Sequence, residues 1–245
     1  MKSVVISQPM FFPWSGMFEQ IRLCDVFVHY DDVQFSKGSF FNRVQIKTPN
    51  GITWLTVPLK DVKSGQNINE TLIDPSPNWR RKHLELLRQS YAKAPFRSEM
   101  LELVESVYGR GHRDLAQFSA DSIETVCQYF GLDEGREFHQ SSQLNIPGVS
   151  TDRVLAIVKS FGGETYVTGH GARNYFGHEL AESMGIAVEY INYRKTPYPQ
   201  LHGDFTPFVS ILDLIANVGR DGRQVLNSTT LPWRTFLHNQ QASAA

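Results

Sequence analysis

The chain has 245 residues, 41% of them hydrophobic and 12% aromatic, so it can bury a sizeable core as one large domain or as one domain with a helical subdomain. Its 24 basic and 25 acidic residues nearly cancel, which argues against nucleic acid as a partner. No apolar run approaches the roughly 20 residues that span a bilayer. The apolar part of the N-terminus is too short for a signal peptide, so we expect a cytoplasmic protein without membrane insertion.

The two cysteines, Cys24 and Cys127, do not form a CxxC pair, so neither a disulfide framework nor a cysteine zinc site is expected. Both fall on apolar helix faces, where a free cysteine packs as a small hydrophobic residue. The eight histidines show no HxH or HExxH spacing. The sequence therefore gives no support for a metal site, and it leaves any cofactor unknown.

The first elements form a strand–loop–helix–strand unit. Residues 4–6 are a β-branched run typical of a strand, and a proline-rich loop over 8–16 follows. Ser15 is a plausible N-cap for a helix over 16–24, whose apolar residues have helical spacing. Residues 26–30 read as a second strand, so the order is that of a βαβ unit.

The next segment predicts a hairpin, with strands over 44–47 and 54–57 and a turn at Asn50-Gly51. An irregular connection with a short strand near Leu72 follows. Three helices are expected from apolar spacings of three and four, over 78–91, 96–108 and 112–130. Gly131 is a natural stop for the third.

The C-terminal part again alternates between strands and helices. Strands are expected over 137–143, 166–168 and 186–191. Helices are expected over 151–161 with Thr151 as the cap, over 174–184 with Gly185 as the stop, and over 209–217 with Ser210 near the start.

These elements predict an α/β fold, a mainly parallel sheet with an antiparallel hairpin and a helical insertion. Residues 1–77 would form an N-terminal α/β part with a ligand loop, and 78–135 a helical subdomain. Residues 136–235 would complete the α/β domain, and 236–245 would be a disordered tail.

The loop over 8–16 and the pair Asp31-Asp32 both follow expected strands, and open α/β sheets bind ligands beyond the carboxyl ends of their strands. Gln8 and Trp14 lie in this loop, which leads into a helix N-terminus that favours an anion. Asp31 or Asp32 could hold a hydroxyl, an amine or Mg²⁺, and Asp31 could act as a base. The fingerprints GxGxxG and GxxxxGK[ST] do not occur. The alternative is that the prolines shape a tight turn and the aspartates cap the next segment.

Two further motifs could contact a ligand. Asn42 and Arg43 follow two phenylalanines, and an arginine in such a setting can recognise a phosphate or carboxylate, or can simply cover a core aromatic pair. His170 stands between Gly169 and Gly171 just after an expected strand, close to Tyr175. It is the strongest candidate for a general acid or base, the alternative being an exposed histidine in a flexible turn.

Gln200, Ser210 and Asp213 form a last candidate group, in which Gln200 could bond a polar substrate group and Asp213 could orient a histidine or bind an amine. The alternative is that Ser210 caps a helix and Asp213 adds charge to its first turn. His83, on a helix beside Trp79, could contact a ligand, but such a histidine is more often a surface residue or a satisfied core residue.

The residues that follow are similar to the WbqC-like family: Gln8-Pro9, Pro13-Trp14, Gly16, Phe18, the run 31–35, Asn42-Arg43 and the run 54–58. The likeness continues through Trp79, His83, Tyr91, Ser141-Ser142, Tyr166, Gly169, Tyr175, Tyr198, Gln200, Phe205, Ser210 and Asp213. Many members carry His or Met where this chain has Ser7, which weakens a role for that side chain. Members usually carry small residues in the loop around Gly169 and Gly171, so a histidine at position 170 is a feature of a subgroup of the family.

The resemblance implies a role in making O-antigens, other surface polysaccharides or secondary metabolites, with an activated sugar or a similar small amine as substrate. The first hypothesis is therefore a transferase that moves an acyl or aminoacyl group to the amine of a nucleotide-linked amino sugar. The alternatives are a nucleotide-dependent ligase resembling adenylyltransferases, against which the missing HxGH signature counts, and a non-catalytic sugar-binding or assembly protein. The expected partner is a small molecule such as a nucleotide sugar, and a homodimer stays open.

Overall fold

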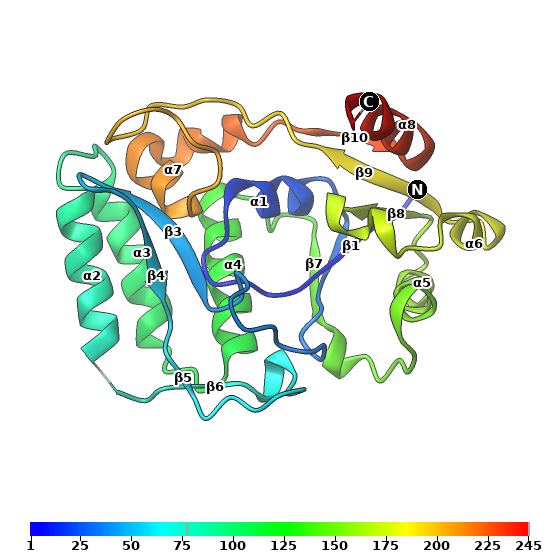
Figure 1. Cartoon of the computed structure of the whole chain (residues 1–245), viewed down its shortest axis with the longest axis horizontal. Helices are drawn as coiled ribbons and strands as arrows, with labels where there is room; N and C mark the ends of the chain where they lie inside the picture. The colour runs from blue at the N-terminus through cyan, green and yellow to red at the C-terminus, as the bar shows by residue number, and fades with distance from the viewer. Residues whose placement is uncertain (77, 245) are drawn as a thin grey trace.

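A computed structural model describes residues 1–76 and 78–244. Pro77, the expected boundary of the first part, and Ala245, the last residue of the expected tail, lie outside the described residues. The chain folds as an α/β protein built on a mostly parallel sheet (Figure 1), as the sequence predicts.

Within the described residues the main sheet has six strands, in the order β10-β9-β8-β1-β2-β7. Five are parallel, and β10 runs antiparallel to β9. The strands are β1 (Ser3–Ser7), β2 (Val26–His29), β7 (Glu137–Gln140), β8 (Thr165–Thr168), β9 (Ala187–Asn192) and β10 (Thr229–Pro232). The inner strands β1, β2, β8 and β9 bury apolar residues on both faces, as in a parallel sheet covered by helices on both sides.

Two small antiparallel pairs lie beside the main sheet. The predicted hairpin pairs β3 (Arg43–Thr48) with β4 (Gly51–Thr56), and Gly51 takes a φ of 103° at its turn. The second pair joins β5 (Leu59–Lys60) to β6 (Leu72–Ile73).

Helices cover both faces of the main sheet (Figure 1). Val5 faces a core cluster that contains α1 (Ser15–Arg22) and α4 (Leu115–Phe130), whereas Val4 and Ile6 face a second cluster. The second cluster involves α5 (Ser150–Ser160), α6 (His178–Ser183) and α8 (Trp233–Ala244). The first layer is extended outward by α2 (Asn78–Ser90), α3 (Arg97–Gly109) and α7 (Ile211–Val218). The short 3₁₀ helices are η1 (Ile68–Glu70), η2 (Ser141–Gln143), η3 (His170–Asn174) and η4 (Gly219–Val225).

The helical segment between β6 and β7 shares its core with the sheet. Phe118, Ile123 and Val126 of α4 belong to the same cluster as Val5 and Phe27 of the sheet. The helices α2 and α3 therefore connect to the sheet through α4 in one continuous core.

The strand order places a topological switch point between β1 and β8. From β1 the chain moves outward through β2 to β7, then returns to pair β8 on the other side of β1 and continues to β9. Ligands of open α/β sheets bind in the crevice outside the carboxyl ends of the two strands at this point. Those ends are Ser7 and Thr168.

Several local expectations need correction. Trp14, not Ser15, occupies the N-cap of α1, because Ser15 is already helical. Thr151 does not cap α5, since its hydroxyl accepts the Gly177 N–H at 3.0 Å. The expected helix over 174–184 is shorter than predicted: α6 covers only His178–Ser183, and Asn174 is the last residue of η3.

The C-terminal segment differs most from the expectation of a disordered tail. Residues 236–240 belong to α8, and Phe236 is 3% exposed, with its ring stacked on Tyr190 at 4.2 Å. The sequence analysis missed β10 and α8, because neither Thr229–Pro232 nor this helix carries a strong periodic apolar pattern. Both elements are held in a regular structure by contacts with β9, and β9 is distant from them in the sequence.

Candidate functional site

The loop that leaves β1 is held rigidly on its far side. Phe11 and Phe12 are fully buried, and Phe12 takes a φ of 36°, which is rare for a bulky residue. Its N–H donates to the Ser122 hydroxyl at 3.0 Å, and its carbonyl accepts the Ser210 hydroxyl at 2.7 Å. These contacts fix where the loop presents its other residues.

Trp14 lies on the other side of this loop and forms a wall beside α1. A Cβ on Gly16 would stand 2.2 Å from the indole, so only glycine permits this close approach. The indole also packs near Tyr193 at 5.0 Å and Phe208 at 5.8 Å, measured between ring centroids. Gly16 therefore acts in the site by allowing Trp14 its position.

An apolar cavity of about 600 Å³ opens beside Trp14. It is lined by Met10, Pro13, Trp14, Phe40, Arg43, Val44, Gly171 and Phe208. Phe40 and Phe208 are each about half exposed at its rim. We call this cavity the apolar chamber.

A second cavity, of about 360 Å³, lies at the carboxyl ends of β1 and β8. We call it the polar chamber. It is lined by Ile6, Ser7, Gln8, Gln20, Tyr30, Val154, Tyr166, Thr168, Gly169, Gly171, Ala172 and Tyr175. Gly171 lines both chambers, so they adjoin at this residue, and we refer to the two together as the switch-point cleft.

Hydroxyl and amide groups dominate the polar chamber. The Gln20 amide donates to the Tyr193 hydroxyl at 2.7 Å, beneath Gly169. A Cβ on Gly169 would lie 3.3 Å from that amide and 3.4 Å from the hydroxyl, so the backbone sits close to both. Ser7, whose role the resemblance weakens, lines this chamber as well.

Tyr30 is held at the wall of the polar chamber by a charged pair. The Arg153 guanidinium lies 5.1 Å from the Tyr30 ring centroid and forms an ion pair with Asp32. Burial opposes ionisation of Asp32, but hydrogen bonds from Arg153 and Ser141 hold its pKa below the usual range. Asp32 thus positions Tyr30 through Arg153 and stays ionised.

Asp31 is placed away from the cleft, in a buried latch between β2 and η2. Only 3% of the residue is exposed. Its carboxylate accepts the Ser141 hydroxyl at 3.0 Å and, from Ser142, the N–H at 2.9 Å and the hydroxyl at 2.6 Å. Because these hydrogen bonds already engage both oxygens of the carboxylate, we expect Asp31 to stabilise the folded protein.

His170 starts η3, but its side chain does not line either chamber. Its Nε2 lies 2.8 Å from the Ile191 carbonyl, and because a carbonyl only accepts, this nitrogen carries the proton. The ring packs between Tyr193 and Phe236, at 5.1 and 4.7 Å between centroids. Its neighbours Gly169 and Gly171 reach the cleft, whereas the imidazole is directed toward β9 and α8.

Asp213 and Gln200 belong to a buried polar cluster around Lys47. The Tyr91 hydroxyl donates to Asp213 at 2.9 Å, and burial raises the pKa of Asp213 despite this bond and one from Tyr198. Lys47 donates to Gln200 Oε1 at 3.2 Å and to the Asp204 carbonyl at 2.7 Å. The cluster fastens the loop over 198–206 to β3 and α7.

Ser210 and Asn42 also make internal bonds. Ser210 is the N-cap of α7, accepting the Leu212 N–H at 3.2 Å, which is the alternative role considered for it. The Asn42 amide donates to the Val57 carbonyl at 2.8 Å. Both residues secure backbone around the cleft.

Arg43 lines the apolar chamber, but its guanidinium is committed to the loop before it. It donates to the Ser39 carbonyl at 3.3 Å and to the Gly38 carbonyl. Its guanidinium carbon also lies 4.3 Å from the Trp54 ring centroid. Arg43 therefore closes the chamber wall with its stem and fixes the loop that carries Phe40.

His83 is a core residue. Its Nδ1 lies 2.9 Å from the Tyr108 hydroxyl, and its ring contacts Trp79 and Phe11 at 5.2 and 6.2 Å between centroids. Burial lowers its pKa to about 4, so the imidazole is neutral at pH 7.

This shift predicts a pH dependence of stability. The folded state resists protonation of His83 while the unfolded state protonates near 6.5, so stability falls as the pH drops from 6.5 toward 4. Between pH 7.5 and 5, His83 should account for about 2 kcal/mol of that loss. The His83→Gln variant should flatten the dependence by this amount in urea unfolding. The exposed His238→Gln is the control, and equal slopes for wild type and His83→Gln would refute the assignment.

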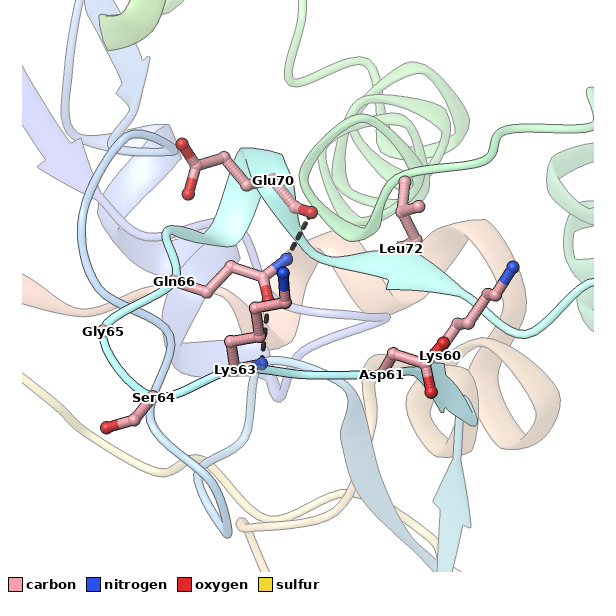
Figure 2. A pocket seen from close by; sticks show the side chains of 8 residues that line it. All are labelled: Lys60, Asp61, Lys63, Ser64, Gly65, Gln66, Glu70 and Leu72. Carbon is pink, nitrogen blue, oxygen red and sulfur yellow. Dashed lines mark hydrogen bonds between the residues drawn. The ribbon is translucent and has the colours of Figure 1, made fainter.

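A separate hollow of about 520 Å³ lies on the loop between β5 and β6 (Figure 2). Its polar groups are bonded to one another: the Gln66 amide donates to the Glu70 carbonyl, and Gln66 Oε1 accepts the Lys63 N–H at 2.9 Å. Its two lysines, Lys60 at the end of β5 and Lys63 in the loop that follows, are exposed. The hollow shares no lining residue with either chamber at the switch point, so the switch-point cleft is the stronger candidate.

Two features are absent from the described residues. No group of three or more His, Cys, Asp or Glu side chains there could hold a metal ion. No helix in that part of the chain is long and apolar enough to cross a membrane. Apart from Arg43, the described side chains that line the two chambers are hydroxyl, amide, aromatic and aliphatic groups.

Comparison with known proteins identifies the family. The model of the WbqC-like protein family matches residues 8–225. The chain belongs to the WbqC-like family. An uncharacterized protein of Mycobacterium tuberculosis (strain ATCC 25618 / H37Rv), Rv1507c, is 33% identical over 230 residues, which cover 92% of this chain and 98% of that protein. No solved structure matches.

In this WbqC-like chain, the structure brings five of the predicted residues to the cleft: Gln8, Trp14, Arg43, Gly169 and Tyr175. The sequence did not single out Gln20, Tyr30 and Phe208, or the supporting groups Arg153 and Tyr193, and it marked Thr168 and Gly171 only as part of the motif around His170. Thr168 and Gly171 lie in the motif that drew attention to His170, so its backbone, more than its imidazole, was the usable signal. Gln20 and Arg153 gave no signal, because polar helix residues usually face water.

Proposed function

We propose that this chain is a transferase of surface-polysaccharide or related small-molecule biosynthesis, which moves an acyl or aminoacyl group to the amine of a nucleotide-linked amino sugar. The observation that carries the proposal is the junction of an apolar and a polar chamber at Gly171, at the switch point of the sheet. Membership of the WbqC-like family supports the substrate class.

The polar chamber suits a sugar. Sugars are bound by hydroxyl and amide groups together with aromatic faces, and this chamber offers Ser7, Gln8, Gln20, Thr168 and Tyr30. Burial raises the pKa of Tyr30, so its hydroxyl stays protonated at neutral pH and can donate a hydrogen bond. The carboxyl-end position matches the usual site for nucleotides in such sheets.

The apolar chamber suits the acyl part of a donor. Trp14, Phe40 and Phe208 offer flat apolar surface, and the volume of about 600 Å³ accommodates a group of drug-like size. With the two substrates meeting near Gly171, the amine would lie next to the acyl carbon, and this proximity alone supplies much of the rate.

The transfer forms a bond between the amine nitrogen and the acyl carbon and breaks the bond from that carbon to the donor's leaving group. The nitrogen loses a proton in the process. His170 remains the candidate to take it, since Nδ1 keeps a free lone pair when Nε2 carries the proton. That role needs a water or a substrate group between His170 and the chamber.

A non-catalytic sugar-binding protein is the second candidate. The observation in its favour is that the cleft-lining side chains among the described residues are hydroxyls, amides and apolar groups apart from Arg43. Such a lining binds a sugar without any chemistry.

A thermal-shift screen with nucleotide-linked amino sugars, ATP, acyl-CoA and amino acids tests the proposal, followed by mass spectrometry for an acylated sugar. Stabilisation by an amino sugar together with the acylated product is the expected result. Sugar binding without product would favour the binding protein, and stabilisation by ATP with pyrophosphate release would favour a ligase. If product forms, His170→Ala should lower kcat far more than the loss of its ring contacts lowers the Tm, and an unchanged kcat would remove His170 from the reaction.

A further inference from the structure

A cavity of about 390 Å³ lies among the first turn of α2, the loop after α3 and the residues around β6. In Figure 1 these segments meet at the lower ends of α2 and α3. The cavity is lined by Ile73, Asp74, Pro75, Arg80, Tyr108, Gly111, His112 and Arg113. None of these residues lines either chamber of the switch-point cleft.

Arg80 lines this cavity with a guanidinium group that has no hydrogen-bond or ion-pair partner among the described residues. Its guanidinium stacks on the Trp79 indole, 4.3 Å from the ring centroid, and this contact leaves its N–H donors unused. Its Nε is buried without a hydrogen-bond partner, and no carboxylate among the described residues forms an ion pair with it. Burial lowers the pKa of Arg80, which reflects the same lack of compensation. Arg80 as a whole is half-buried, but its shielded Nε–H lacks an acceptor, and an anion in the cavity would supply one.

The other charged groups on the lining leave the cavity positive. Arg113 is exposed, and its side chain has no partner among the described residues. His112 Nε2 lies 3.0 Å from Asp121, and Asp121 also pairs with Arg110, so that carboxylate is already shared. Asp74 is the one carboxylate on the described lining, and it accepts the Ser76 N–H at 2.8 Å.

We propose that this cavity is a second binding site that takes a small molecule through a phosphate group. Two guanidinium groups on one lining offer several N–H donors, and a phosphate presents several charged oxygens that can bond both at once. A carboxylate presents only two oxygens and a single charge, so it should bind the two guanidinium groups more weakly than a phosphate does. The Trp79–Arg80 stack holds one guanidinium in place before the ligand arrives, which lowers the entropic cost of binding.

Isothermal titration with inorganic phosphate at constant ionic strength tests this site. Wild type should bind, Arg113→Gln should weaken binding at least fivefold, and Arg80→Gln at least tenfold. Arg81→Gln is the matched control, because Arg81 is the next residue on α2, pairs with Glu85 at 3.8 Å and has a 71% exposed side chain. Its affinity should be unchanged.

Arg113→Gln keeps the test valid if Arg80→Gln proves unstable, since the exposed Arg113 makes no contact that folding requires. Acetate, titrated in parallel, should bind at least tenfold more weakly than phosphate. The proposal is overturned if phosphate does not bind wild type, if Arg113→Gln and Arg81→Gln bind it equally well, or if acetate binds as tightly as phosphate.

Discussion

The Gly16→Ala variant is expected to lose roughly 2 kcal/mol of unfolding free energy, the middle of the range for overpacking a filled site. The added Cβ would stand 2.2 Å from the Trp14 indole, which is far inside van der Waals contact. Trp14 must then leave its place beside Tyr193 and Phe208, and the apolar chamber loses a wall. Urea unfolding measures the first effect, and a shift in tryptophan emission the second.

Two variants isolate the cause. Gly109→Ala makes the same change at the end of α3, where a Cβ meets nothing within 4 Å, so it should be neutral or stabilising by up to about 1 kcal/mol. In the double variant Trp14→Ala/Gly16→Ala, the second substitution should cost much less than it does alone, because the clash is gone. Additive costs would show that the indole does not rest on Gly16.

The Asp31→Asn variant is expected to lower the free energy of unfolding by about 2–4 kcal/mol, the range for a broken buried polar network. The carboxylate accepts three hydrogen bonds from Ser141 and Ser142, and an amide presents an N–H to one of those donors. The loss should appear in urea unfolding at pH 7. This outcome differs from that of a catalytic base, whose loss would lower turnover far more than stability.

The exposed Asp221→Asn controls for the change of charge and should stay within about 0.5 kcal/mol of wild type. A variant pair Ser142→Ala and Asp31→Asn/Ser142→Ala should show coupling, since both changes act on the same bond. An Asp31→Asn protein as stable as wild type would return Asp31 to the list of catalytic candidates.

Most of the fold could be predicted from local pattern. The β-branched runs at 4–6 and 26–30, the Asn50-Gly51 turn and the apolar spacing of the three middle helices each mark an element by its own chemistry. The strand β10 and the helix α8 could not be found in this way. Their order depends on the pairing of Thr229–Pro232 with β9 and on the burial of Phe236, which are contacts distant in sequence.

For the candidate site, too, some residues could be predicted from the sequence and others could not. Gln8, Trp14 and Gly169 were predicted because they follow strands, and position relative to a strand end can be read from the chain. The side chains of Asp31, Asp213 and Gln200 gave the same polar signal, yet each is occupied by internal bonds to Ser142, Tyr91 or Lys47. Sequence shows that a polar group exists, but only the fold shows which partner it has.

We propose that the switch-point cleft, whose two chambers adjoin at Gly171, binds the substrate. Gly171 takes no left-handed φ, and a Cβ there meets nothing within 4 Å, so Gly171→Leu should fold normally while its side chain fills the junction of the two chambers. Gly109→Leu, at another open glycine, is the matched control.

The deciding measurement is the affinity of a UDP-linked amino sugar for wild type, Gly171→Leu and Gly109→Leu, by isothermal titration. If the cleft is the substrate site, wild type and Gly109→Leu should bind the sugar. Gly171→Leu should lose at least a hundredfold in affinity at an unchanged Tm. Equal affinity in all three proteins would contradict a substrate site at the switch point of this sheet.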